Sequence, residues 1–174
     1  MLQKYNRYKI LQDFFDFPRR EFHIREICRL TKISQPSVMN HLKELLKENL
    51  IIKERKSIYP IFRANRENEQ FKTYKKFNII SRLDKTKLID YIYDSCLPNS
   101  IILFGSASKG EDIEKSDIDL FVQSNEKKLN LEKYEKLLNR EVNLFFQEDF
   151  NKLSKELRNN IINGIILKGY LKVF

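Results

Sequence analysis

The sequence predicts an α+β protein in two parts, a helical segment ending in a short β-hairpin and then a small α/β domain whose mixed sheet is flanked by helices. Three observations support this. Apolar residues recur at helical spacing over the first 50 residues, apolar runs of strand length follow residue 100, and the excess positive charge is concentrated early in the chain. The length of 174 residues suits two small domains.

Composition narrows the class of protein. Hydrophobic residues make up 41% of the chain and charged residues 33%, a globular balance that excludes a disordered or collagen-like chain. The sequence has no apolar run of about 18 residues that would span a membrane, and residues 1–9 lack the apolar core of a secretory signal. Only Cys28 and Cys96 are present, far apart and with two histidines in the chain, which disfavours a disulfide scaffold or zinc site and predicts a cytoplasmic protein.

The net charge of +9 is unevenly distributed. Residues 1–65 carry 14 Lys and Arg against 7 Asp and Glu, whereas residues 101–174 carry 12 of each. A polyanion is therefore the expected partner of the first third. A lysine-rich, solvated surface is the alternative that charge alone leaves open.

Two short helices are predicted first. Residues 1–17 place apolar side chains at helical spacing, and Pro18 ends the pattern. A second helix begins around His23, with Glu26 three residues later, and ends near Thr31.

A third helix follows directly. Ser34 is a suitable N-cap, and Pro36 is tolerated in the first turn because amides there lack helical acceptors. Its apolar stripe consists of Val38, Leu42, Leu45 and Leu46. Asn49 suits the left-handed position beyond the helix, and strands are expected at 50–53 and 58–62 around a basic tip.

Three helices followed by a basic hairpin predict a winged helix-turn-helix. The stretches HIREICRLTKISQPSVMNHLKELLKENLI and IYPIFRAN resemble the ArsR/MarR-like class of winged-helix repressors, and the resemblance covers roughly residues 5–65. A recognition helix enters the major groove with its N-terminal half leading. The resemblance therefore implies double-stranded DNA as a partner.

The candidate DNA contacts fall into two groups. Side chains on the third helix suited to base edges and phosphates are Gln35, Ser37, Asn40 and His41. Basic residues suited to backbone phosphates are Lys43, Lys47, Arg55 and Lys56. Each has a structural alternative, such as capping or solvation of the helix, and a winged helix can also dock another protein.

A connector and a helix separate the two parts. Residues 66–80 place Phe71, Tyr74 and Phe77 at helical spacing, and a further helix is expected over 86–96. This divides the chain into a winged helix-turn-helix at 1–65, the helical connector and a second domain at 81–174. The aromatic stripe fits ordinary packing, or a homodimer contact together with the first helix.

The residues with catalytic chemistry lie in the second domain. Residues 100–104 and 117–122 are strand-like, and two residues that are two apart on a strand face the same way, so Asp117 and Asp119 direct both carboxylates to one place. Hard Mg²⁺, which takes oxygen ligands, is the usual counter-ion. Gly105 permits close approach of a ligand, and Ser106 can donate to phosphate at a helix start.

The stretches LFGSASKG and SDIDLFV, with ten residues between Gly-Ser and Asp-x-Asp, resemble the polymerase-β-like nucleotidyltransferase superfamily, particularly its minimal branch. ELRNNIINGIILKG resembles the helix and strand that close such domains. The resemblance covers roughly residues 81–174. It implies a bound nucleoside triphosphate (NTP), Mg²⁺ or Mn²⁺ held by Asp117 and Asp119, and a third carboxylate on a later strand.

One departure concerns that third position. In the predicted strand 141–146 the matching residue is Asn143, whose amide ligates metal weakly and accepts no proton at neutral pH. Glu141, two residues earlier on the same face, is a candidate substitute. Lys109 stands where relatives carry Arg and is a candidate phosphate contact.

Three hypotheses follow for function. The first is a DNA-binding protein whose second domain binds Mg-NTP and transfers a nucleotidyl group to a hydroxyl or protein acceptor. The second is a nucleotide-sensing transcriptional regulator with weak catalysis, which Asn143 favours. The third, implied by the resemblance, is an antitoxin-type nucleotidyltransferase that acts on a HEPN-like partner protein.

Overall fold

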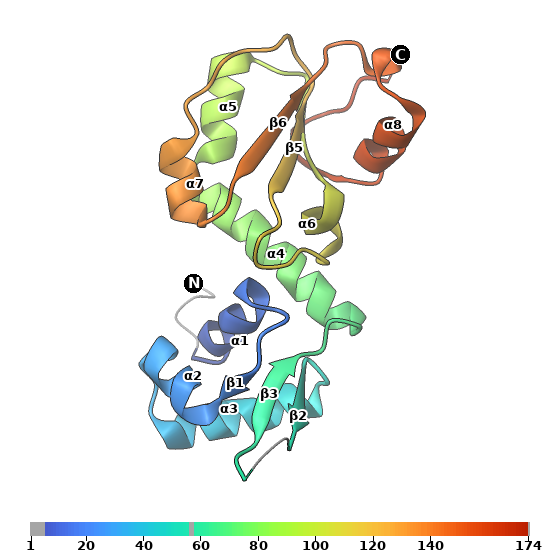
Figure 1. Ribbon diagram of the computed structural model, residues 1–174. Helices are drawn as coiled ribbons and strands as arrows, with labels where there is room; N and C mark the ends of the chain where they lie inside the picture. The colour runs from blue at the N-terminus through green and yellow to red at the C-terminus, as the bar shows by residue number, and fades with distance from the viewer. Residues whose placement is uncertain (1–5, 56–57, 174) are drawn as a thin grey trace. The chain divides into compact units, whose positions relative to one another are not determined.

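The computed structural model describes residues 6–55 and 58–173 (Figure 1). The chain forms two compact units, Met1–Lys75 and Lys76–Phe174, and the boundary falls within helix α4 (Glu69–Thr86). The architecture is α+β, as the sequence predicted. Among the described residues, no helix combines the length and the apolar character needed to cross a membrane.

The first unit contains three helices and a small antiparallel sheet (Figure 1). Its elements before α4 are α1 (Asn6–Asp16), β1 (Phe22–His23), α2 (Ile24–Thr31), α3 (Gln35–Lys47), β2 (Ile51–Glu54) and β3 (Ile61–Ala64). The sheet order is β1-β3-β2, with β3 antiparallel to both neighbours. The aromatic rings of Phe14 and Phe22 meet edge to face in the core that the helices and sheet share.

The three predicted helices are confirmed within one or two residues at the ends that the structure describes. Ser34 is the N-cap of α3, although its hydroxyl makes no capping hydrogen bond. Asn49 adopts the left-handed conformation with φ of +56°. Val38, Leu42 and Leu45 are buried, and Leu46 is partly buried.

The hairpin differs from the prediction in its second strand. The sequence placed that strand at 58–62, but β3 spans Ile61–Ala64, and Ile58 and Tyr59 are exposed before it. Pro60, with its fixed φ and missing N–H, stands between these residues and β3. The two-residue strand β1 was not predicted because its identity depends entirely on pairing with β3.

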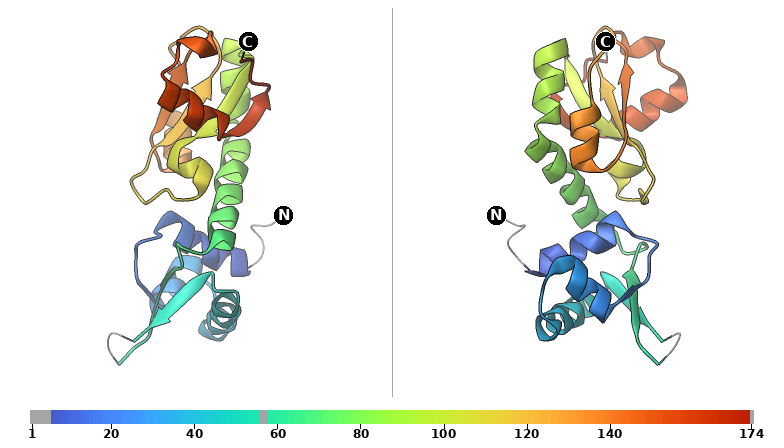
Figure 2. Two further views of the ribbon diagram at one scale, coloured as in Figure 1. Left: turned by 90° about the vertical axis from the view of Figure 1, so that its right-hand side faces the viewer. Right: turned by 60° about the vertical axis from the view of Figure 1, so that its left-hand side comes forward.

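The second unit is built on a four-stranded mixed sheet (Figure 2). Its elements after α4 are α5 (Leu88–Cys96), β4 (Ser100–Phe104), α6 (Gly105–Lys109), β5 (Ile118–Val122), α7 (Glu132–Leu138), β6 (Val142–Phe146), the 3₁₀ helix η2 (Phe150–Lys152), α8 (Lys155–Ile162) and β7 (Ile165–Gly169). The strand order is β6-β5-β4-β7. β5 and β6 are parallel, and β4 is antiparallel to both of its neighbours.

Helices pack on both faces of this sheet. Side chains of α4, α5 and α7 form one core with Leu103, Leu120 and their neighbours on the same face. On the other face, Phe104 and Phe121 pack with residues of η2 and α8 in a smaller core. The second face is thus only partly covered, and it is the face that carries Asp119.

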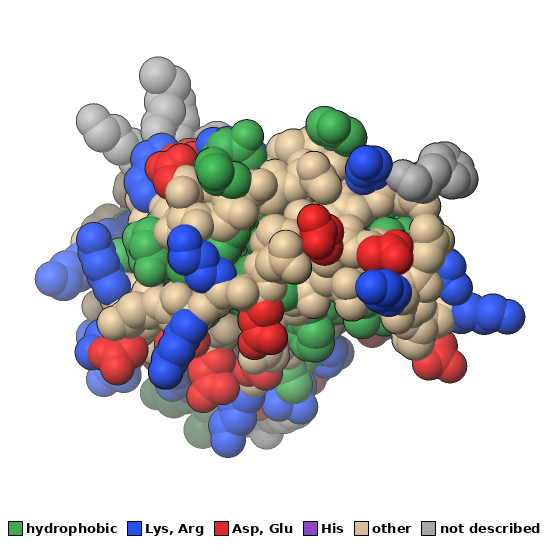
Figure 3. Space-filling model, turned by 90° about the horizontal axis from the view of Figure 1, so that it is seen from above, with side chains coloured by type: hydrophobic (Ala, Val, Ile, Leu, Met, Phe, Trp, Pro, Cys, Tyr) green, Lys and Arg blue, Asp and Glu red, His purple; other side chains and the backbone are tan. Residues whose placement is uncertain are grey.

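The predicted strands and closing elements of this unit are confirmed, with Ser100–Phe104 matching in full. The helical connector predicted at 66–80 is part of α4, which extends to Thr86 and begins after Asn68, whose Oδ1 accepts from the Phe71 amide at 2.9 Å. On the molecular face shown in Figure 3, acidic and basic side chains are interspersed.

Candidate functional site

Strand pairing brings two polar residues side by side on the partly covered face. Asp119 on β5 lies directly beside Asn143 on β6, and Phe104 on β4 lies beside Asp119 on the other side. Laterally paired residues direct their side chains to the same face of a sheet. Gly105 follows Phe104, so the Gly-Ser turn begins next to Asp119.

The Asn143 side chain connects the two carboxylates. Its amide nitrogen Nδ2 donates to Asp117 Oδ2 at 3.1 Å and to Asp119 Oδ1 at 3.2 Å. The three side chains are all partly buried. Because one nitrogen atom reaches both carboxylates, the position it occupies is one from which a single positive charge could contact both.

The neutral amide also has an electrostatic role. Two like charges at close range repel, and a third carboxylate at position 143 would add to that cost. Asn143 instead supplies two N–H groups. In the described residues, no group of three or more His, Cys, Asp or Glu side chains gathers at a point where it could hold a metal ion. The donor set here is two carboxylates and one amide.

Gly105 is required at its position for two reasons. Its φ of +71° lies in the left-handed region that favours glycine. A Cβ atom added to it would lie 2.5 Å from Asp119 Oδ2, closer than real Cβ contacts. The close approach between the turn and the carboxylate therefore depends on the missing side chain.

Ser106 and Lys109 lie on α6, one helical turn apart, and therefore share a face of that helix. Ser106 is partly buried and Lys109 is exposed. Ser108, which the sequence reasoning did not single out, is buried, and its hydroxyl donates to the Gly105 carbonyl at 2.8 Å. This hydrogen bond stabilises the Gly105 turn. The role of Ser108 is apparent only from its burial and its hydrogen bond, which the sequence does not show.

A buried ion pair supports the loops that lead into the site. Arg140 Nη1 lies 2.5 Å from Asp112 Oδ2, and their side chains are only 7% and 4% exposed. Asp112 precedes Asp117 by five residues, and Arg140 precedes Asn143 by three. Removing one partner of such a pair leaves a buried charge, which is strongly destabilising. The sequence could not reveal this pair, because its members are 28 residues apart.

Glu141 lies just before β6 and is exposed, and its backbone carbonyl accepts from the Ile118 amide at 2.9 Å. The hydrogen bonds to Asp117 and Asp119 come from Asn143. A role of Glu141 as substitute base stays a prediction.

In the first unit, three predicted DNA contacts form one exposed stripe of α3. Asn40, Lys43 and Lys47 are exposed and spaced by three and four residues, which places them on one helical face opposite the buried leucines. Arg55 is exposed beyond β2, and Lys56 lies outside the described residues.

Gln35 and Ser37 occupy the first turn of α3. Ser37 is partly buried. Gln35 is exposed and lines a surface cavity of about 380 Å³ that also involves residues at the start of α2 and, before β3, Tyr59 and Pro60. The cavity thus lies between the start of the helix-turn-helix and the hairpin.

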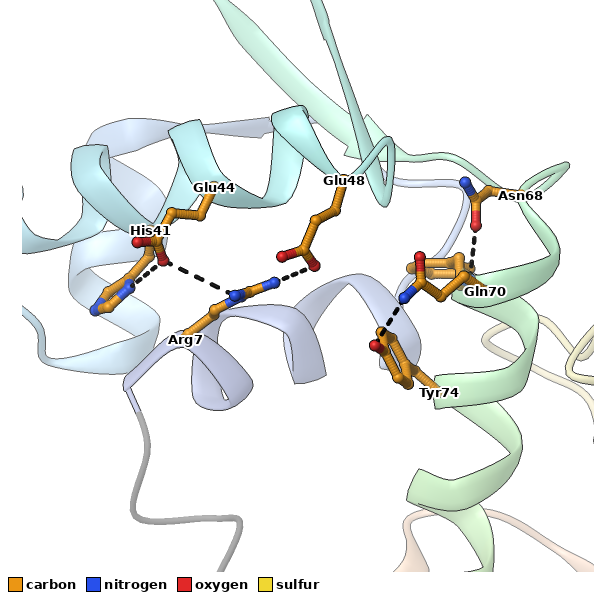
Figure 4. A network of polar contacts seen from close by, with 8 residues as sticks. Arg7, His41, Glu44, Glu48, Asn68, Gln70 and Tyr74 are labelled. Atoms are coloured by element: carbon orange, nitrogen blue, oxygen red, sulfur yellow. Dashed lines mark hydrogen bonds and ion pairs between the residues drawn. The ribbon is translucent and has the colours of Figure 1, made fainter.

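His41 faces different neighbours from those the sequence suggested (Figure 4). Its Nδ1 lies 3.5 Å from Glu44 Oε2, and the same oxygen lies 4.0 Å from the Arg7 guanidinium on α1. Arg7 also pairs with Glu48. His41 therefore belongs to the side of α3 that contacts α1, and its DNA contact is a prediction that this geometry does not favour.

Comparison with protein families finds a match in each of the two regions. Residues 86–171 match the family described as polymerase beta, nucleotidyltransferase, and residues 6–53 match the bacterial regulatory protein arsR family. Searches of curated proteins and of solved structures find no significant match. The two matches contain the Asp117–Asn143 site and the α3 stripe respectively.

Proposed function

We propose that this chain, an ArsR-type helix-turn-helix followed by a nucleotidyltransferase-family domain, binds duplex DNA with its first unit and a divalent-metal complex of an NTP with its second. The observation that carries the nucleotide part is the convergence of Asp117 and Asp119 on one amide nitrogen beside the Gly105 turn. The exposed, basic α3 stripe supports the DNA part.

The residues at this place suit Mg²⁺ or Mn²⁺. Two carboxylates within hydrogen-bond distance of one point are the hard oxygen ligands that these ions prefer. Asp117 and Asp119 would hold the ion. The Asn143 side-chain oxygen would be a weaker third ligand once the amide turns, because in the structure its nitrogen Nδ2 faces the carboxylates. When bound, the ion supplies charge neutralisation for the triphosphate. Ser106 and Lys109, on one face of α6, would contact phosphate oxygens.

Transfer of the nucleotidyl group should be slow in the wild-type protein. The acceptor hydroxyl must lose a proton, and Asn143 has no basic atom to receive it. The double hydrogen bond from Asn143 therefore also favours a second function, a transcriptional regulator that senses a nucleotide with little or no turnover. The two functions differ in whether the nucleotidyl group of a bound NTP is transferred to an acceptor.

Calorimetric titration of the full chain with ATP, GTP, CTP and UTP, with and without Mg²⁺, tests nucleotide binding. Wild type should bind only with metal, and Asp117→Asn and Asp119→Asn should each lose that binding. Asp84→Asn is the matched control, because Asp84 is an exposed carboxylate on α4. Unchanged affinity in both site variants would show that the site is assigned wrongly.

Incubation with α-labelled NTP then separates the two functions. Label on the chain or on an added acceptor supports transfer, and metal-dependent binding without label supports sensing. DNA binding is tested by titrating labelled duplex at several salt concentrations, where affinity should fall linearly on a double-logarithmic plot. Binding that is insensitive to salt would contradict phosphate contacts.

A further inference from the structure

An exposed phenylalanine lies on the same sheet face as the proposed nucleotide site. Phe145 is two residues beyond Asn143 on β6, so both side chains leave the strand on the same side. Its cross-strand partner Phe121 is fully buried, whereas Phe145 is 40% exposed. β6 is an edge strand of the sheet. A large apolar ring is thus left in contact with solvent beside three polar residues.

A buried neighbour orients this ring. The rings of Phe145 and Phe104 lie 5.3 Å apart between centroids at 72°, an edge-to-face contact. Phe104 is buried and pairs with Asp119, and Gly105 follows it. The exposed ring is therefore held by the same residue that begins the Gly-Ser turn.

We infer that Phe145 is the platform on which the base of the bound nucleotide stacks. This inference rests on the proposed NTP binding. A base is flat and has a π-face that stacks on aromatic side chains. Phe145 lies two positions beyond Asn143, about 7 Å along the strand, and this spacing leaves room for the ribose between the phosphates and the base.

A stacking contact selects by ring area and does not read the hydrogen-bonding edge of a base. Purine triphosphates should therefore bind more tightly than pyrimidine triphosphates, and Phe145 should contribute nothing to a choice between adenine and guanine. The proposed substrate class is accordingly a purine nucleoside triphosphate.

The test compares NTPs with inorganic tripolyphosphate, which has the phosphates but no base. In calorimetric titrations with Mg²⁺, Phe145→Ala should weaken the affinity for ATP and GTP by roughly 5- to 150-fold. It should weaken the affinity for CTP and UTP less and leave that for tripolyphosphate unchanged. Phe145→Trp should preserve ATP and GTP affinity, and Phe145→Leu, apolar without a π-system, should not.

Phe77→Ala is the matched control, since Phe77 is 63% exposed on α4, whose Ile79 and Leu83 pack on the opposite face of the sheet. It should bind all ligands as wild type does. If Phe145→Ala loses as much affinity for tripolyphosphate as for ATP, the stacking inference is wrong, because the variant then damages the phosphate site itself.

Two further outcomes distinguish failure of the stacking inference from failure of the proposed NTP binding. If Asp119→Asn abolishes NTP binding while Phe145→Ala leaves the affinities and the purine preference unchanged, the platform is wrong and the proposed function stands. If wild type binds neither NTP nor tripolyphosphate with Mg²⁺, the proposed function fails and the platform fails with it.

Discussion

The two units arrange their functional side chains in opposite ways. In the first unit, Asn40, Lys43 and Lys47 are exposed along one stripe of α3. In the second unit, Asp117 and Asp119 meet at a single nitrogen atom of a third side chain. A dispersed surface divides its binding free energy among many contacts, whereas a convergent site depends on each member. Single substitutions should therefore have small effects in the first unit and decisive effects in the second.

The largest effect is expected at position 143. Asn143→Asp restores a basic group beside the acceptor, and general-base assistance is typically worth about 10²–10⁴-fold in rate. The transfer rate at saturating Mg²⁺ should rise accordingly above that of the wild type. Without metal, the variant should be less stable than wild type, because three carboxylates then replace two carboxylates and an amide.

Glu141→Ala measures whether the neighbouring exposed carboxylate already serves as the base. It should abolish the residual wild-type transfer only if Glu141 is the substitute. Fast wild-type turnover that is indifferent to Glu141 would contradict the argument that the site lacks a base.

Gly105→Ala should have the next largest effect on the site formed by Asp117, Asp119 and Asn143. The added Cβ meets Asp119 Oδ2 at 2.5 Å, so the carboxylate must move. Displacement by 1 Å can cost about 10²-fold in rate, and metal-dependent NTP binding should weaken as well. Gly110→Ala is the matched control because Gly110 has nearly the same φ, +72°, at the end of α6. Both variants should lose about 1 kcal/mol of stability or somewhat more, and equal nucleotide affinity in the two would contradict the close-approach argument.

The dispersed DNA surface should respond more weakly. Asn40→Ala should reduce discrimination between operator sequences by about 1–3 kcal/mol, the worth of a good base contact. Arg55→Ala should instead weaken binding to all sequences alike and reduce the salt slope by about 1. Duplex titrations at several salt concentrations measure both quantities.

His41→Gln tests the orientation that the structure gives this side chain. Because His41 contacts Glu44, which also contacts Arg7 on α1, the variant should leave sequence discrimination unchanged. A loss of discrimination as large as that of Asn40→Ala would restore His41 as a base contact.

The smallest effect is on stability and depends on pH. Burial, followed by repulsion from Asp16 and Glu26, raises the pKa of Asp13 on α1 from 3.8 to about 6, while Lys9 and Arg20 oppose the shift. Between about pH 4 and 6 the folded state therefore binds more protons than the unfolded state, and stability falls as the pH rises through this window.

Asp13→Asn should remove this dependence and stabilise the fold at pH 7 by on the order of 1 kcal/mol, since solvent screening reduces the effect at a partly buried site. Urea unfolding at pH 4 and pH 7 measures the difference. Asp84→Asn is an exposed control expected to change little, and a wild-type stability that rises between pH 4 and 6 would contradict the prediction.

The sequence alone determined the elements whose signals are local. Helical periodicity, the Pro18 stop and the left-handed Asn49 predicted α1 to α3, and the apolar run at Ser100–Phe104 predicted β4 in full. The Asp-x-Asp spacing predicted that Asp117 and Asp119 direct their carboxylates to one place, and their shared contact with Asn143 Nδ2 confirms it, because strand geometry over a few residues limits where those side chains can point.

Only the tertiary structure decided the features that depend on partners distant in the chain. The two-residue β1 exists through pairing with β3, and β3 begins later than its apolar pattern suggested. In the sequence, Asn143 is a departure from the motif. The register of β5 against β6 places it beside Asp119, where its amide donates hydrogen bonds to both carboxylates. The same register left Phe145 exposed beside them, since burial is settled by packing across strands and residue type alone does not determine it.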